Sequence, residues 1–108
     1  MNRHYLVFSS WPQRESAREA AKGLVESRLA ACVHILPQAS SIYVWEEELH
    51  EDQEHLMICK TTRHRYPELE RKILACHPYE LPEIVAFPIT EGLPGYLAWV
   101  EAQTRQSN

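Results

Sequence analysis

The chain has 108 residues, of which 44% are hydrophobic and 24% are charged, and its formal net charge is −4. This composition is typical of one globular domain over residues 1–108 and excludes disordered and fibrous proteins. The acidic balance argues against a partner nucleic acid, because phosphate binding needs clustered Lys and Arg. No apolar run reaches the roughly 18 residues of a membrane span, so we expect no direct membrane insertion.

The first residues show no signal-peptide pattern. Three cysteines lack C-x-x-C spacing, which argues against a disulfide framework or a structural zinc site: Cys32, Cys59 and Cys76. Reduced thiols in a reducing compartment fit this pattern best, and we predict a cytoplasmic protein.

The first half of the chain predicts strands around one helix. Residues 5–8 are typical of a strand that ends at Ser9-Ser10. Over residues 14–29, apolar residues recur at helical spacing. Residues 31–36 predict a second strand, stopped or kinked at Pro37, and residues 41–45 resume it.

An acidic window follows, with six of the fifteen acidic residues and no Lys or Arg: Glu46, Glu47, Glu48, Glu51, Asp52 and Glu54. Residues 55–62 then predict another strand. The polar pair Glu51-Asp52 separates the two strands, so we predict a long hairpin whose outer part is charged.

The second half predicts a helix, a strand and a short helix. Tyr66 to Cys76 carry helical spacing, with Pro67 suited to the first turn. Residues 77–82 contain two prolines and are irregular. Residues 83–87 predict a strand limited by Pro88, and residues 94–103 a last helix.

The order β-α-β-β-α-β-α predicts an α+β fold, the ferredoxin-like βαββαβ sandwich, with an additional C-terminal helix and a long hairpin between the second and third strands. Both main helices then cover one face of the sheet. The strands are apolar on both sides, because Ile42 and Val44 alternate with Tyr43 and Trp45. An uncovered apolar face predicts a homo-oligomer.

Several segments together resemble the CutA divalent-cation tolerance family. They follow the family order along nearly the whole chain: residues 29–33, 41–46, 60–62, 77–84 and 96–99. The resemblance implies a ferredoxin-like protomer, a homotrimer joined through long hairpins, and association with copper or another divalent cation. It also implies kinship with trimeric PII-type regulators, which bind small molecules between subunits.

Two positions depart from the family pattern. His34 stands where the family commonly has Asn, which adds an imidazole. Ser9-Ser10 stands where some members carry a cysteine proposed as a copper ligand, which removes a soft donor.

We single out two sets of residues as candidate metal ligands outside the hairpin. Cys32 and His34 lie two apart on a strand and leave from one face, although a buried thiol beside a hydrogen-bonded histidine is the alternative. His77 lies on a loop stiffened by Pro78 and Pro82, and with Glu83, and with Lys60 and Tyr79 nearby, it would line a cleft between subunits. The alternative for His77 is a helix C-cap.

A second candidate cluster lies on the hairpin. Glu46, Glu48 and His50 are predicted to share one strand face, with His55 approaching from the partner strand. The alternative is a solvated charged arm that prevents edge-to-edge aggregation.

Enzyme motifs are absent from the sequence, which has only three glycines and neither G-x-S-x-G nor H-E-x-x-H. This absence predicts a non-enzymatic protein. Together with the resemblance to the CutA family, which implies the trimer and the metal, it leads us to predict a non-enzymatic homotrimer that binds copper or another divalent cation and contributes to metal tolerance. The competing prediction is a PII-like trimeric module that binds a small metabolite or a protein partner, with Lys60, Arg63, His77 and Glu83 lining the intersubunit cleft.

Overall fold

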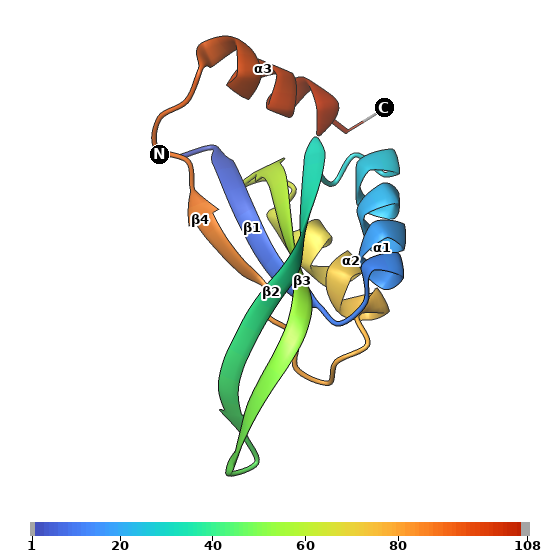
Figure 1. The fold of residues 1–108 in the computed structure, drawn as a ribbon. Helices are drawn as coiled ribbons and strands as arrows, with labels where there is room; N and C mark the ends of the chain where they lie inside the picture. Colours follow the sequence, from blue (N-terminus) through green and yellow to red (C-terminus); the bar gives the residue numbers. More distant parts are fainter. Residues whose placement is uncertain (1, 107–108) are drawn as a thin grey trace.

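A four-stranded antiparallel sheet carries two helices on one face. The computed structural model describes residues 2–106, and the strands lie in the order β2-β3-β1-β4. The elements run in this order along the chain: β1 His4–Trp11, α1 Arg14–Glu26, β2 Cys32–Trp45, β3 Glu48–Thr62, α2 Tyr66–Cys76, β4 Val85–Pro88 and α3 Pro94–Gln103. The predicted ferredoxin-like fold with an additional C-terminal helix is confirmed (Figure 1).

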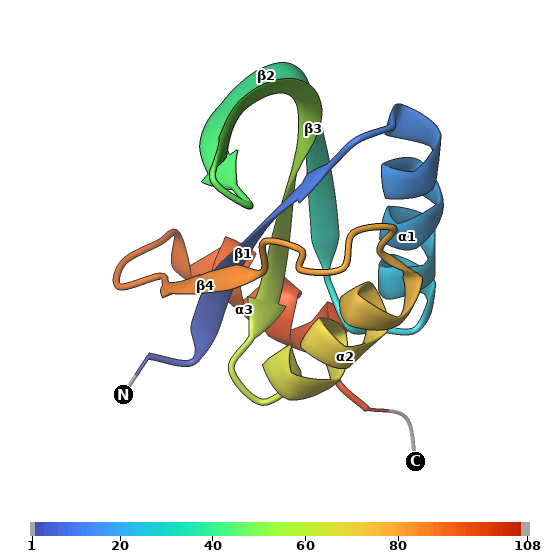
Figure 2. The ribbon, with the colours of Figure 1, turned by 90° about the horizontal axis from the view of Figure 1, so that it is seen from below.

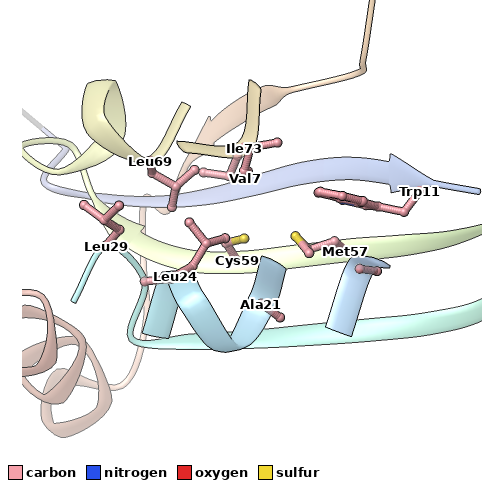
Figure 3. Close-up of a cluster of buried hydrophobic side chains, with 11 residues drawn as sticks. Val7, Trp11, Ala21, Leu24, Leu29, Met57, Cys59, Leu69 and Ile73 are labelled. Atoms are coloured by element: carbon pink, nitrogen blue, oxygen red, sulfur yellow. The ribbon is translucent and has the colours of Figure 1, made fainter. Parts of the chain in front are cut away.

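Helices α1 and α2 cover one face of the sheet, which we call the inner face. Val7, Met57 and Cys59 point to this face and are fully buried against Leu24 of α1 and Leu69 of α2 (Figure 3). Close-packed apolar side chains of this kind supply most of the stability of a small domain.

The opposite face, which we call the outer face, carries the alternate residues of the same strands. Helix α3 lies across one end of the sheet (Figure 1), where Glu101 pairs with His4 Nε2 at 3.0 Å. The rest of this face keeps large apolar side chains in solvent in the single chain, among them Leu36, Val85 and Phe87. The apolar alternation on both sides of the sheet is therefore present as predicted.

Strands β2 and β3 continue beyond the sheet as a hairpin arm, residues 39–54. The predicted turn at Glu51-Asp52 is wrong, because Trp45 pairs with Glu48 and the two-residue turn is Glu46-Glu47. Both turn residues have positive φ, 52° and 67°, as a type I′ hairpin turn requires. Glycine and asparagine are the usual signals for such a turn, and their absence explains the error.

Strand β2, which we predicted to stop or kink at Pro37, continues through a β-bulge there, so the kink is the correct alternative. The register shifts by one residue between Leu36 and Ala39, and Gln38 has φ 60°. A bulge bends a strand and increases its twist, and the arm curls over beyond it (Figure 2). Other boundaries also differ from the prediction. The largest differences are that α1 ends at Glu26, β1 extends to Trp11 and β4 begins at Val85.

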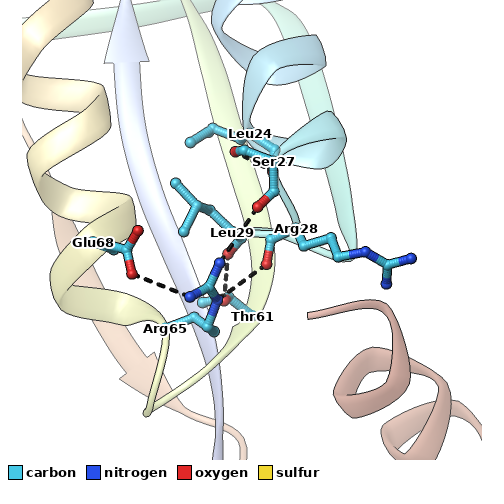
Figure 4. Close-up of polar contacts among 7 residues, drawn as sticks. All are labelled: Leu24, Ser27, Arg28, Leu29, Thr61, Arg65 and Glu68. Atoms are coloured by element: carbon cyan, nitrogen blue, oxygen red, sulfur yellow. Dashed lines mark hydrogen bonds and ion pairs between the residues drawn. The ribbon is translucent and has the colours of Figure 1, made fainter. Parts of the chain in front are cut away.

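A polar cluster closes the gap between the end of α1 and the start of α2 (Figure 4). The buried Arg65 guanidinium donates to the Arg28 carbonyl at 3.2 Å and the Ser27 carbonyl at 3.3 Å, and pairs with Glu68 at 3.1 Å. The buried Thr61 hydroxyl donates to the Leu29 carbonyl at 2.6 Å. These bonds satisfy carbonyl groups of the segment that follows the end of α1.

Candidate functional site

His77 is buried at the end of α2, with both ring nitrogens engaged. Nδ1 accepts the Tyr79 backbone N–H at 3.1 Å, so Nε2 carries the proton and donates to the Ser10 carbonyl at 2.8 Å. Burial lowers the pKa of the imidazole, against the opposing effects of the Ser10 carbonyl and Glu54. A metal ion at His77 would have to displace one of these two hydrogen bonds.

Glu83 reaches the same residue of β1 that His77 holds. Glu83 lies two residues before β4 begins, and its Oε1 accepts a hydrogen bond from the Ser10 hydroxyl at 2.8 Å. The structure thus brings His77, Glu83 and Tyr79 together around the end of β1. Lys60 lies elsewhere, beside Cys32 near the opposite end of the sheet.

Cys32 and His34 share the outer face of β2, as their spacing predicts. Cys32 lies opposite Lys60 of β3, and the Lys60 ammonium donates to His34 Nδ1. Burial, followed by the nearby Cys32 thiol, raises the pKa of Tyr96 in α3. Cys32 is half-buried beside Tyr96, and one nitrogen of His34 is already engaged.

The predicted hairpin cluster is divided by the course of the arm. Glu48 and His50 share one face of β3, where the His50 ring stacks on Tyr43 with centroids 5.3 Å apart. Glu46 lies in the turn. The prediction that His55 approaches from the partner strand is wrong, because His55 belongs to β3 as well. It pairs with Trp11 of β1 and points to the opposite face from His50.

Glu54 is a site residue that the sequence did not reveal. Its side chain is 5% exposed and accepts hydrogen bonds from the Ser41 and Tyr79 hydroxyls, the second at 2.5 Å. Burial and this bond to Glu54 raise the pKa of Tyr79. In the sequence Glu54 is one of six acidic residues in the acidic window. It is buried because the strand beyond the bulge and the loop after α2 contact it, through Ser41 and Tyr79.

Across residues 2–106, no three His, Cys, Asp or Glu side chains lie close enough to hold a metal ion together. None of the helices in the described part of the chain is long and apolar enough to cross a membrane.

The sequence model of the CutA1 divalent ion tolerance protein family matches residues 5–103. The chain belongs to the CutA1 family. The resemblance of its sequence segments is confirmed, and involvement with divalent-cation tolerance follows at the level of the family.

Individual relatives agree with this assignment. The divalent-cation tolerance protein CutA of Thermus thermophilus is 52% identical over 92% of this chain and 96% of its own length. The mouse protein CutA is 43% identical over 91% of this chain, which matches 55% of that longer protein.

Solved CutA1 structures share the fold. The Thermus thermophilus structure superposes with a TM-score of 0.92 at 50% identity, covering 94% of this chain and 99% of the other. CutA1 from Oryza sativa superposes with a TM-score of 0.93 at 35% identity, covering 98% and 97%.

Proposed function

We propose that this CutA1-family chain works as a homotrimer that binds copper or another divalent cation without catalysing a reaction. The observation that carries the proposal is the outer face, where Cys32 and His34 share one strand face and large apolar side chains are exposed in the single chain. The number three comes from the family resemblance. Symmetry brings equivalent donors together where subunits meet.

Burial of the exposed apolar side chains supports the assembly. Val44 in the arm is 66% exposed, and Phe87, which packs on Phe8 with ring centroids 5.1 Å apart, is 49% exposed. Each Å² of apolar surface removed from water contributes about 25 cal/mol of favourable free energy. Burial of these side chains between subunits would therefore stabilise the trimer.

Two donor pairs fit the metals of this proposal. Cys32 with His34 combines a thiol and an imidazole, a soft and a borderline donor that suit copper. Glu48 with His50 combines carboxylate and imidazole, which suit harder divalent ions. Each pair needs its copies in other subunits to complete a coordination sphere.

Copper titration tests the metal part of the proposal. Binding of Cu(II) is measured by calorimetry for the wild type, for Cys32→Ser with His34→Ala, and for Glu48→Gln with His50→Ala. Loss of binding in one double variant locates the ion at that pair, while His77→Ala should leave binding unchanged because both nitrogens of His77 are engaged. Wild-type protein that binds Cu(II) no better than buffer would refute the metal function.

Sedimentation velocity tests the assembly. Val44→Asp places a charge on a side chain that is already exposed in the single chain, so it should leave the protomer folded and dissociate the trimer. The matched control is Val25→Asp, which changes an exposed valine of α1 on the helix-covered side and should sediment as a trimer. A wild-type chain that sediments as a folded monomer would contradict the proposal.

We further propose a cytoplasmic location, supported by the three free cysteines of the described chain, one buried and two accessible. Fractionation of cells that produce the protein, with an antibody against it, tests this location. Recovery in an oxidising compartment would refute it.

A further inference from the structure

A pocket of about 840 Å³ lies at the end of the sheet opposite the hairpin arm. The start of β1, the turn between β3 and α2, and the end of α3 enclose it, and Figure 1 shows these segments away from the arm. In the ladder between β1 and β3, His4 pairs with Thr62 at this end, and Trp11 pairs with His55 at the other end, where the arm begins. We call this space the end pocket.

Hydrogen bonds within one chain hold the walls of the end pocket together. The Arg63 backbone N–H donates to the Arg3 carbonyl at 2.9 Å, which joins the turn after β3 to the start of β1. Glu101 of α3 pairs with the Arg3 guanidinium and with His4 Nε2, both at 3.0 Å, which joins α3 to β1. The pocket therefore exists in the protomer and needs no neighbouring subunit to form.

The proposed trimer would leave the end pocket open. Every residue that lines it is polar or charged, and charged residues are depleted from the centres of subunit interfaces. On α3 the exposed aromatic side chains are Tyr96 and Trp99. Trp99 lies two residues from Glu101, about 200° around the helix, so the two point to opposite sides of α3. A subunit that covers Trp99 would therefore leave the Glu101 side in solvent.

The end pocket is basic, although the chain has a net charge of −4. Arg3, Arg63 and Arg105 line it, together with a single acid, Glu101. Both oxygens of Glu101 are engaged, one by Arg3 and one by His4. Arg63 and Arg105 form no ion pair with any residue from 2 to 106. Two guanidinium groups of the pocket are thus available to an anion.

The end of α3 does not cancel this positive charge. The carboxyl end of a helix carries partial negative charge, which repels anions. Here the Arg28 guanidinium donates to the carbonyls of Ala102 and Gln103, both at 3.5 Å. The Thr104 hydroxyl donates to the Val100 carbonyl at 2.8 Å. The last carbonyls of α3 are therefore engaged, and Arg28 adds a further positive charge beside them.

The lining selects a ligand that is polar over its whole surface. It offers no aliphatic wall and no Phe, Tyr or Trp side chain from residues 2–106 on which a nucleotide base could stack. Guanidinium groups match phosphate oxygens through paired hydrogen bonds. Asn2, Thr62 and Gln106 add neutral amide and hydroxyl donors. One phosphate group would occupy a small part of the pocket, so linked phosphate groups fit its volume better.

We propose that the end pocket binds a compact anion that carries two or more phosphate groups. Arg63 and Arg105 contact its oxygens, and Arg3, which Glu101 holds in place, contacts it from the start of β1. Each chain carries one complete site. The inference does not rest on the metal function proposed above.

Calorimetric titration of the full chain with pyrophosphate and with orthophosphate, at low ionic strength, tests the proposal. We expect one pyrophosphate per chain, bound about tenfold more tightly than orthophosphate, because pyrophosphate presents more charge to the arginines. Equal affinities, or no binding of pyrophosphate, would overturn the proposal. A stoichiometry of one pyrophosphate per three chains would place the anion on a symmetry axis and would also overturn it.

Charge-neutral variants locate the binding. Arg63→Gln and Arg105→Gln should each weaken pyrophosphate binding by about three- to tenfold, the loss expected for one partly exposed ion pair. Both side chains are exposed, so both variants should fold. The control Arg14→Gln removes the same charge from an exposed position at the start of α1, outside the pocket, and should bind as the wild type does. Equal weakening by Arg14→Gln would show only general attraction to positive charge and would overturn the proposal.

Two further variants separate this inference from the proposed trimer and its metal. Val44→Asp, which should dissociate the trimer, should bind pyrophosphate with wild-type affinity, because the lining comes from one chain. Cys32→Ser with His34→Ala should also bind it unchanged, because neither residue lines the pocket. Loss of binding in the first variant would place the site between subunits, and loss in the second would show that the anion binds through a metal ion. Either result would overturn the proposal.

Discussion

The inner face of the sheet and the hairpin arm are built from the same kinds of residue but differ in what covers them. Val7, Met57 and Cys59 are fully buried beneath α1 and α2, whereas Ile42 and Leu49 in the arm are 66% and 74% exposed. The chain completes its own core on the inner face and leaves apolar side chains of the arm exposed. If the proposed trimer covers the arm, the stability of the protomer and the assembly are separable properties.

The largest effect should come from a core deletion on the inner face. Leu69→Ala removes a fully buried side chain of α2 and should lower the free energy of unfolding by about 3 kcal/mol, because it loses buried apolar surface and leaves a cavity. Chemical denaturation at a fixed protein concentration measures this. The control Leu74→Ala, on an exposed position of the same helix, should cost less than about 1 kcal/mol. Equal losses would contradict the separation between covered and uncovered surfaces.

A smaller effect should come from the loss of a buried hydroxyl on the inner face of the sheet. Thr61→Val keeps the shape of the side chain but removes the hydroxyl that donates to the Leu29 carbonyl. A buried carbonyl without its donor should cost about 1–3 kcal/mol of unfolding free energy. Thr90→Val, at an exposed position, is the control and should be close to neutral in the same denaturation experiment.

His77, which follows α2, should make the free energy of unfolding depend on pH. Burial lowers its pKa in the folded protein, so below the ordinary value of 6.5 the unfolded chain binds more protons. The contribution of His77 is complete above pH 6.5 and is lost as the pH falls below it. His77→Gln should therefore flatten the fall in unfolding free energy below pH 6.5, and His64→Gln, in an exposed turn, is the control. An unchanged slope in His77→Gln would contradict this account.

The smallest effect should be a gain in stability. Gly23 lies inside α1, and a Cβ added there would meet only Lys72 Cε at 3.9 Å. Gly23→Ala should raise the thermal unfolding free energy by about 0.5–1 kcal/mol, because alanine loses less backbone entropy in a helix. Gly92→Ala would bring a Cβ within 3.2 Å of Leu97 and should gain less. A loss of stability in Gly23→Ala would show that α1 packs on α2 more tightly than these distances indicate.

Much of the fold could be predicted because local patterns and tertiary packing agree. The helix Tyr66–Cys76 was predicted with its observed bounds, since Pro67 marks its first turn and apolar residues recur along one side. The hairpin turn could not be predicted, because Glu46 and Glu47 adopt positive φ without the usual glycine or asparagine. Strand pairing between β2 and β3 imposes that conformation.

The candidate site was only partly visible in the sequence. The spacing of Cys32 and His34 correctly placed both on one strand face, because side chains alternate with a period of two. No local pattern indicated that Glu54 would be buried, or that both nitrogens of His77 would be engaged. These contacts join β1, β3 and the loop after α2, which are distant in sequence.

The sequence by itself determined the order of helices and strands, the two apolar faces of the sheet and the family to which the chain belongs, because periodicity and motif order are local properties. Only the tertiary structure decided that one acid of six, Glu54, is buried and that the arm curls over beyond the bulge. Those outcomes follow from one extra residue in β2 and from contacts between distant segments, which no local pattern encodes.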